Sequence, residues 1–243
     1  MAAQPLPTAL SADALAKEFR DFAYSVSHDL GAPARAVVEF SKLLKNEELE
    51  ALTEDGKLYL SLIVSNGEKL QHMLSGLLDY SRLNTLAKTL SMVDCKVVLE
   101  HCQVVLKEKI KEKRAVLEIT PLPHVRADAE QLMQLFLAVL DNALTFHLPD
   151  TAPYIQLSVT EEANGWRFSI RDNGIGIEPR FHKQIFDPFQ RLHTQEEYPG
   201  IGMGLTLAQK IATRHGSRIG VDSMLHHGTT FYFTLPKEDA PNG

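Results

Sequence analysis

Two glycine-rich segments and one histidine are the parts of the sequence that could do chemistry. The first segment, RDNGIGIEP at 171–179, begins where an expected strand ends in Asp172. Gly174 and Gly176 follow, and glycine lets a backbone come close to a ligand. Asp172 could therefore accept a hydrogen bond from the edge of a nucleotide base.

The second segment, PGIGMGL at 199–205, places Gly200, Gly202 and Gly204 at the opening of an expected helix. Free amide N–H groups at a helix N-terminus suit phosphate groups. The segment lacks the Lys of a P-loop, and it does not follow the first strand of a dinucleotide-binding βαβ unit, so both of those sites are excluded. Taken alone, a glycine-rich turn is more often a plain turn.

The segment SVSHDLGAP at 25–33 puts His28 and Asp29 side by side on an expected helix. His28 falls off the apolar stripe of that helix, so its ring should be accessible. A neutral imidazole nitrogen is a competent nucleophile toward a γ-phosphoryl group, and Asp29 could orient the ring or take its proton. A lone surface His next to an Asp is usually only part of a solvated face, so its context decides.

Two long helices must position this histidine, and each carries apolar residues at a period near 3.5. The first seam, within 13–46, consists of Leu15, Phe19, Phe22, Val26, Leu30, Pro33, Val37, Phe40 and Leu44. The second seam consists of Tyr59, Ile63, Asn66, Leu70, Met73, Leu77 and Tyr80. One hairpin has too little material to close a core around both seams, so we expect a homodimer through residues 13–88, built as a four-helix bundle.

From about residue 89 the pattern becomes mixed, which predicts an α/β sandwich over 89–237. The expected elements are a charged helix at 95–113, strands near 115–119 and 124–127, an apolar helix at 129–147, strands at 154–160 and 166–172, a helix at 203–215, and strands at 217–223 and 229–236. The AsnGly pair at 164–165 is expected to form the turn of the central hairpin.

Composition limits the possible partners. The net charge of −6 gives no basic face for nucleic acid, and no apolar run is long enough to span a membrane. Cys95 and Cys102 form neither a disulfide framework nor a metal site by spacing, so we expect reduced thiols and a cytoplasmic location. We expect 1–12 to be a linker from an input domain outside this sequence and 238–243 to be a tail.

The order of the motifs resembles that of sensor histidine kinases, whose ATP-binding domain is of the histidine kinase, Hsp90 and gyrase type. Asp141-Asn142-Ala143 is similar to their N box, and the segments DNGIGI, FDPFQ, GIGMGL and HGTTFYF are similar to four further boxes in the same order. The resemblance implies that ATP and Mg²⁺ bind here. Asn142 would hold Mg²⁺ and Asp172 would recognise adenine.

The same resemblance implies roles for the other motif residues. The glycines would shape the pocket and its lid: Gly174, Gly176, Gly200, Gly202 and Gly204. Phe186 and Phe189 would anchor the lid, although a core role is the better expectation for both. Thr229 would touch the adenine pocket or only pair in a strand.

The segment around His28 resembles the phosphoacceptor box of these kinases. It implies autophosphorylation of His28 and phosphotransfer to an Asp of a response-regulator receiver domain. HDLxxPxR and FQRLHTQEEYPGIGMGL are similar to the phytochrome-like branch, so the missing input would be an N-terminal sensor domain of the bilin-binding type.

Three positions depart from the family pattern and leave two alternatives open. Ala138 and Thr145 stand where the N box commonly has a polar residue and a Lys, which would weaken phosphoryl transfer. The alternatives are therefore a net phosphatase of the response regulator and a signalling or ATP-binding module without catalysis. Ala32, where phosphatases of this family often have Thr or Asn, does not support the first alternative.

Overall fold

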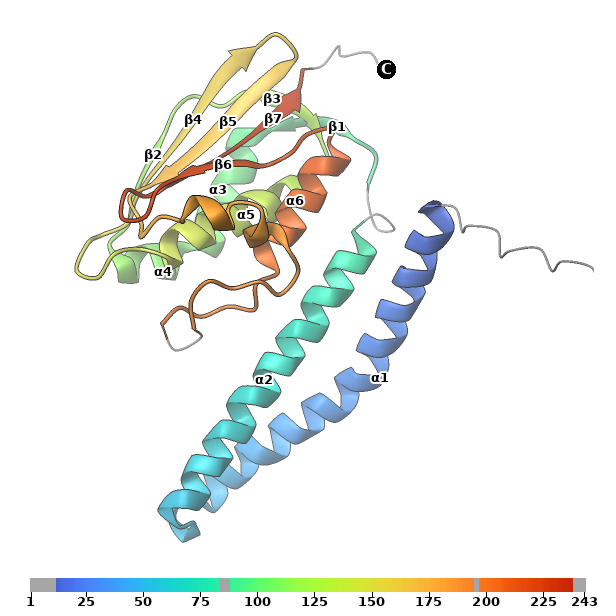
Figure 1. Ribbon diagram of the computed structural model, residues 1–243, viewed down its shortest axis with the longest axis vertical. Helices are drawn as coiled ribbons and strands as arrows, with labels where there is room; N and C mark the ends of the chain where they lie inside the picture. The colour runs from blue at the N-terminus through green and yellow to red at the C-terminus, as the bar shows by residue number, and fades with distance from the viewer. Residues whose placement is uncertain (1–11, 84–87, 195–196, 238–243) are drawn as a thin grey trace, which may run out of the picture. The chain divides into compact units, whose positions relative to one another are not determined.

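The structure is a computed structural model, and it describes residues 12–83, 88–194 and 197–237. The chain divides into two compact units, 1–85 and 86–243 (Figure 1). The predicted tail and all but the last residue of the predicted linker lie outside the described residues. The predicted domain boundaries at 13, 88 and 237 stay predictions.

The first unit is the expected helical hairpin. Helix α1 (Ala12–Glu47) and helix α2 (Glu54–Arg82) are joined by a short 3₁₀ turn, η1 (Leu49–Ala51). Thr53 caps α2, because its Oγ1 accepts a hydrogen bond from the Gly56 amide at 3.2 Å. Such a cap satisfies one of the free amides that open a helix.

Small residues form the face along which α1 and α2 pack. The buried positions are Ala23, Ser27, Gly31, Ala34 and Val38 in α1, and Leu60, Leu74, Gly76 and Ser81 in α2. A Cβ built on Gly67 would lie 2.5 Å from Val38 Cγ2, so the two helices approach closely at that point.

The predicted seams therefore lie on a different stripe from the one that joins the two helices. Their large residues are exposed in the single chain: Phe22, Leu30, Val37, Phe40, Leu44, Tyr59, Ile63 and Leu70. The side chains of Leu15 and Phe19 lie outside the described residues. Helices α1 and α2 approach each other along small residues, and the large seam residues are left for the second copy of the hairpin that was expected.

The second unit contains a five-stranded sheet and a two-stranded sheet. The large sheet has the order β2-β4-β5-β7-β6, with β2 parallel to β4 and the other pairs antiparallel. Its strands are β2 (Val116–Ile119), β4 (Tyr154–Glu162), β5 (Gly165–Asp172), β6 (Gly220–Ser223) and β7 (Thr229–Pro236). The small sheet pairs β1 (Ser91–Asp94) with β3 (His124–Ala127). Only β1 was not expected.

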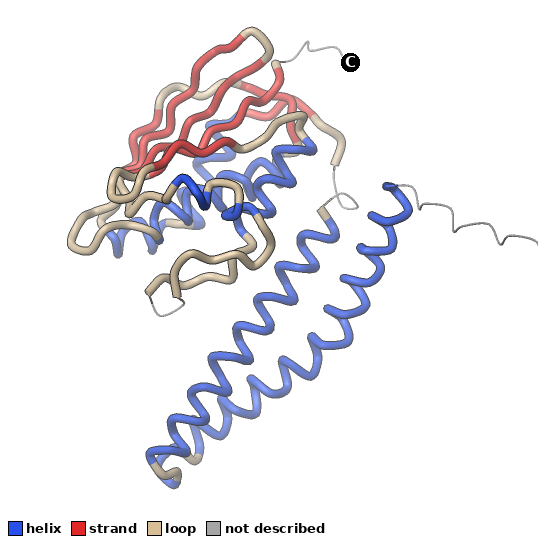
Figure 2. The backbone as a smooth tube through the Cα atoms, viewed as in Figure 1, coloured by secondary structure: helices blue, strands red, loops and turns tan. Residues whose placement is uncertain are grey.

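Helices cover one face of the large sheet (Figures 1 and 2). They are α3 (Cys95–Val105), α4 (Lys107–Lys113), α5 (Ala129–Thr145) and α6 (Gly204–Arg214), with the short 3₁₀ turns η2 (Pro179–Phe181) and η3 (Gln184–Phe186). The predicted single helix at 95–113 is wrong: it breaks at Leu106, where φ is −90° and ψ is 3°.

The core lies between α5 and the sheet. Phe136 of α5 meets Phe168 of β5 edge-on at a ring-centroid distance of 5.7 Å, and Phe168 stacks on Phe233 of β7 at 5.3 Å. Cys95 and Cys102 are buried free thiols, and burial raises the pKa of each to about 12. They therefore remain protonated and act as small apolar side chains.

The hairpin between β4 and β5 differs from the prediction. Glu162 pairs with Gly165, so the turn consists of Ala163 and Asn164 rather than 164–165. Gly165 already belongs to β5, where a Cβ would lie 2.2 Å from the Leu235 carbonyl oxygen. The glycine is needed for this close approach of β7 and not for the turn. Within the described ranges, no helix is long and apolar enough to cross a membrane.

Candidate functional site

A cavity of about 310 Å³ opens in the second unit beside α5 and the first turn of α6. Seven residues expected at the site line it: Asn142, Asp172, Gly176, Gly200, Gly202, Gly204 and Thr229. Its walls come from segments far apart in the sequence, namely the end of α5, the loop after β5, residues 190–193 and 199–205, and the start of β7. A volume of this size is at the lower end of the range for small-molecule pockets.

Asp172 lies at the base of the cavity and is 8% exposed. Its Oδ1 accepts hydrogen bonds from the Gly174 amide at 2.8 Å and the Thr229 amide at 3.1 Å. Burial raises the pKa of this carboxyl to about 6, against the effect of the two amides. The second oxygen, Oδ2, has no hydrogen-bond partner among the described residues, so one acceptor is left for a ligand.

Thr229 both pairs in a strand and lines the cavity, so the two expectations for it coincide. Its hydroxyl lies 2.9 Å from Ser223 Oγ, which also accepts a hydrogen bond from the Ile177 amide at 2.8 Å. Gly228 has a φ of +80°, and a Cβ on it would lie 2.1 Å from the Asp172 carbonyl oxygen. Ser223 and Gly228 were not predicted as site residues, although the HGTT segment held the signal for Gly228.

The two glycines after Asp172 allow close backbone contacts. A Cβ on Gly174 would lie 2.3 Å from the Phe146 carbonyl oxygen, and one on Gly176 would lie 2.0 Å from the Met224 carbonyl oxygen. Gly176 also has a φ of +73°, a conformation that other residues rarely adopt. Gly176 lines the cavity, whereas Gly174 does not.

Residues 190–193 and 199–204 form another side of the cavity. The Phe189 amide donates to the Gly202 carbonyl at 3.1 Å, and a Cβ on Gly202 would lie 2.5 Å from the Gln190 carbonyl oxygen. Phe186 packs edge-on against Phe231 at 6.4 Å, as a core residue would, while Phe189 is 37% exposed.

Helix α6 begins at this side of the cavity without a side-chain cap. Its N-cap residue is Met203, which makes no side-chain cap hydrogen bond, and Gly202, Met203, Gly204 and Leu205 all line the cavity. The first amides of α6 are thus free to meet an anion. Arg191 also lines the cavity, and its guanidinium donates to the carbonyl oxygens of Thr194 and Tyr198.

Asn142 lines the cavity from α5, and its carboxamide has no hydrogen-bond partner within the described part of the chain. There is also no cluster of three His, Cys, Asp or Glu residues that could hold a metal, again within the described part. A single amide oxygen fits Mg²⁺, which keeps most of its ligands as water and phosphate oxygens. Mg²⁺ would therefore bind here together with a phosphate chain.

His28 and Asp29 lie on the first unit, in α1. His28 Nδ1 is 3.0 Å from Asp29 Oδ1, and their side chains are 73% and 70% exposed. The hydrogen bond with His28 lowers the pKa of Asp29, so this carboxyl is ionised and can only accept. Nδ1 therefore carries the proton of the neutral ring, and the free lone pair is on Nε2. Tyr24 stacks near the ring, at a centroid distance of 6.2 Å.

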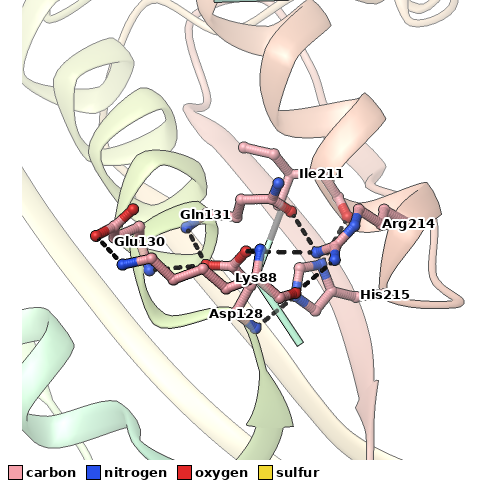
Figure 3. A network of polar contacts seen from close by, with 7 residues as sticks. All are labelled: Lys88, Asp128, Glu130, Gln131, Ile211, Arg214 and His215. Atoms are coloured by element: carbon pink, nitrogen blue, oxygen red, sulfur yellow. Dashed lines mark hydrogen bonds and ion pairs between the residues drawn. The ribbon is translucent and has the colours of Figure 1, made fainter. Parts of the chain in front are cut away.

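A separate polar cluster joins the beginning of the second unit to α5 and α6 (Figure 3). Asp128 is 2% exposed and accepts the Lys88 amide at 2.8 Å through Oδ2, while its Oδ1 accepts the first amides of α5. Arg214 donates to the Lys88 carbonyl at 2.7 Å. His215, 3% exposed, accepts the Asp128 amide at 3.0 Å. The cluster fixes where the chain enters this unit.

Two family models match this arrangement. The His Kinase A (phospho-acceptor) domain matches residues 20–86, and the histidine kinase-, DNA gyrase B- and HSP90-like ATPase matches residues 127–239. The chain belongs to the histidine kinase family. This histidine kinase therefore combines a phosphoacceptor hairpin with an ATPase-type domain.

Relatives of this histidine kinase include phytochromes. It is 39% identical over 219 residues to cyanobacterial phytochrome A of Nostoc sp., covering 90% of this chain and 28% of that protein. It is 37% identical to the phytochrome-like protein Cph1 of Synechocystis sp., covering 90% of this chain and 29% of that protein. The chain thus spans less than a third of the length of these relatives.

Among solved structures, full-length ShkA in complex with AMPPNP is similar to this histidine kinase. The TM-score is 0.66 at 26% sequence identity, and the match covers 92% of this chain and 47% of that chain. The likeness spans both the helical hairpin and the α/β unit, so the predicted fold class is confirmed.

Proposed function

We propose that the chain transfers the γ-phosphoryl group of ATP to His28 and then to an aspartate of a response-regulator receiver domain. The observation that carries this proposal is the exposed His28–Asp29 pair, with Nδ1 and Oδ1 3.0 Å apart. An exposed imidazole with its lone pair on Nε2 is a nucleophile. ATP bound to the ATPase-type unit of the same chain would supply the electrophile, its γ-phosphorus.

The cavity would hold ATP by its base and its phosphates. Asp172 Oδ2 would accept a hydrogen bond from the adenine amino group, with Thr229 beside it. The phosphate chain would lie toward the free amides at the start of α6 and toward Gly200, Gly202 and Gly204. Mg²⁺, held by Asn142 and the phosphates, would offset negative charge during transfer.

In the transfer step, the Nε2 lone pair of His28 attacks the γ-phosphorus. The bond from that phosphorus to the β,γ-bridging oxygen breaks, and its electron pair leaves with ADP. The ring gains positive charge, and Asp29 takes the Nδ1 proton. In the second step an aspartate oxygen of the receiver domain attacks the phosphorus, the N–P bond breaks, and Nδ1 regains its proton.

A homodimer through residues 13–88 would complete the hairpin. Large apolar side chains of α1 and α2 are exposed in the single chain, among them Phe22, Leu30, Val37, Phe40 and Tyr59. Soluble proteins rarely leave so long an apolar surface uncovered, and a second copy would bury it in a four-helix bundle. The names of the relatives support an N-terminal sensor domain of the bilin-binding type as the input. The expected cytoplasmic location stays a prediction.

Incubation with γ-labelled ATP and Mg²⁺ tests the kinase. We expect acid-labile label on the wild-type chain, none on His28→Ala or Asn142→Ala, and passage of the label to a receiver domain. His28→Ala should still bind ATP, since His28 lies on the other unit. Label that persists on His28→Ala would contradict the proposal.

A net phosphatase is the second candidate, because Ala138 and Thr145 line the cavity where the resemblance leads one to expect polar and cationic groups. A chain that takes no label but strips phosphate from a phosphorylated receiver domain would establish it. A chain that does neither while it still binds ATP would be a signalling module without catalysis.

A further inference from the structure

The wall of the cavity formed by the last turn of α5 carries little positive charge. Asp141, Asn142 and Thr145 line the cavity there, and Asp172 adds a second carboxyl at its base. Among the described lining residues, Arg191 alone is a permanent cation, and its guanidinium already donates to two carbonyl oxygens. A nucleotide triphosphate needs more positive charge than this wall supplies.

Lys109 brings an ammonium group to this wall from a neighbouring helix, α4. Its Nζ lies 2.6 Å from Thr145 Oγ1 and 2.5 Å from Asp141 Oδ1. The Thr145 hydroxyl donates its own proton to the Asp141 carbonyl at 2.7 Å, so its oxygen is free to accept from Lys109. Both partners of the ammonium thus belong to the cavity wall, on either side of Asn142 in the sequence.

The position of Lys109 sets it apart from the other basic residues of the same helix. Its side chain is 28% exposed, whereas Lys107 and Lys111 are exposed and Lys113 pairs with Glu112. The break at Leu106 starts a new helix and turns Lys109 toward α5. A run of mixed charges such as the one at 107–114 usually forms a solvated helix face, and Lys109 is the exception.

We propose that Lys109 binds the terminal phosphates of the nucleotide and supplies the cation that Thr145 lacks. The proposal rests on the proposed ATP site and adds one phosphate-binding residue to it. Without nucleotide, Asp141 and Thr145 hold the ammonium at the wall. A bound triphosphate then competes with Asp141 for this flexible point charge, which has three donors and a four-carbon stem. The positive charge beside the terminal phosphates would thus come from α4 rather than from α5.

Four variants separate a phosphate-binding role from a merely structural one. Lys109→Gln keeps hydrogen-bond donors for Thr145 and Asp141 but removes the charge, and Lys109→Arg keeps the charge. Lys111→Gln is the matched control, an exposed lysine of the same helix. Lys109→Gln combined with Thr145→Lys moves the cation to α5.

The affinities of the full chain for MgATP and for AMP are measured by displacement of a fluorescent nucleotide, with melting temperature as a check of folding. We expect Lys109→Gln to weaken MgATP binding roughly tenfold, as the loss of one charge-assisted hydrogen bond would, and to leave AMP binding unchanged. Lys111→Gln should change neither affinity, and Lys109→Arg and the double variant should bind MgATP nearly as the wild type does.

Equal affinities of Lys109→Gln and the wild type for MgATP would overturn the proposal and leave Lys109 as a tie between α4 and α5. Equal weakening of MgATP and AMP would overturn it too. If Lys109→Gln does not fold, the double variant with Thr145→Lys and Lys109→Arg still decide, because weak MgATP binding by both, with AMP binding intact, would contradict a role for the charge. A wild-type chain that binds no MgATP would instead refute the nucleotide site itself.

Discussion

His28 Nδ1 and Asp29 Oδ1 lie 3.0 Å apart on an exposed face of α1. This contact fixes the tautomer of the ring, because an ionised carboxylate can accept but not donate. It points the reactive lone pair of Nε2 away from Asp29. The geometry gives the two adjacent residues separate roles, one as nucleophile and one as proton acceptor.

Asp29→Asn should therefore slow autophosphorylation without affecting the nucleotide site. An amide cannot take the Nδ1 proton, and general-base catalysis typically contributes about 10²-fold or more. We expect a loss of roughly that size in the initial rate of labelling, with the affinity for MgATP unchanged. Asp21→Asn, a change of another exposed carboxyl in α1, serves as the control and should label at the wild-type rate. A normal rate for Asp29→Asn would remove Asp29 from the mechanism.

Asp172→Asn should stabilise the second unit while it abolishes recognition of ATP. Burial raises the pKa of this carboxyl to about 6, so at pH 7 its charge is held at a cost to the folded state. Asn keeps an oxygen for the amides of Gly174 and Thr229 and removes the charge, which should raise the free energy of unfolding by on the order of 1–2 kcal/mol. Its NH₂ group would face the adenine amino group, donor against donor. Denaturation and nucleotide titration, with exposed Asp222→Asn as the control, would show whether stability and binding move in opposite directions.

Gly176 and Gly216 offer a matched pair for the cost of a side chain in the loop after Asp172. Their φ angles are +73° and +74°, but a Cβ on Gly176 would lie 2.0 Å from the Met224 carbonyl oxygen and one on Gly216 would meet nothing within 4 Å. Gly216→Ala should cost about 1 kcal/mol from its backbone conformation alone. Gly176→Ala should cost roughly 3 kcal/mol or more, because the backbone must also move. Trp166, the single tryptophan of the chain, lies in β5 and reports unfolding of this unit by fluorescence. Equal costs would show that the contact with Met224 relaxes freely.

His215 should make the second unit less stable in mild acid. Burial lowers its pKa below the usual range, and its Nε2 accepts the Asp128 amide while Nδ1 faces the Ile211 carbonyl at 2.8 Å. The folded state thus binds fewer protons than the unfolded state, so the contribution is complete above about pH 6.5 and is lost as the pH falls below it.

The raised pKa of Asp172 changes stability in the opposite direction, because protonation of this buried carboxyl stabilises the fold as the pH falls through about 6. The effect of His215 is therefore measured in Asp172→Asn, by urea denaturation between pH 5 and pH 8 with Trp166 fluorescence. We expect stability to fall toward pH 5, and to fall less when His215→Gln is added. An unchanged pH dependence in the double variant would mean that another group is responsible.

Much of this fold could be predicted from the sequence because its elements carry strong periodic signals. The long helices of the hairpin and the alternating strand β7 are examples, and β7 spans the residues that were expected. Leu106 was missed as a helix break because an apolar residue within a helical pattern gives no local stop signal. β1 was missed because its four residues depend on pairing with β3, a contact that no local pattern encodes.

Site residues that belong to a sequence motif could be predicted. Residues that only tertiary packing brings to the site could not. Asp172, Asn142 and the glycines of the two loops belong to recognisable segments. Lys109 belongs to a charged run that reads as a solvated face, and only the packing of α4 on α5 brings it to Thr145. Ser223, likewise, touches the lining residues Thr229 and Ile177, and its contact with Ile177 joins residues far apart in the sequence.

Phosphorylation of His28 is tested by locating the phosphate after the full chain has been incubated with MgATP. The bound nucleotide is quantified first, and the phosphorylated position is then mapped by mass spectrometry under neutral conditions and by ³¹P NMR. We predict one acid-labile phosphate on His28, attached to Nε2. Phosphate on another residue or on Nδ1, or none on a chain that holds ATP in its cavity, would contradict it.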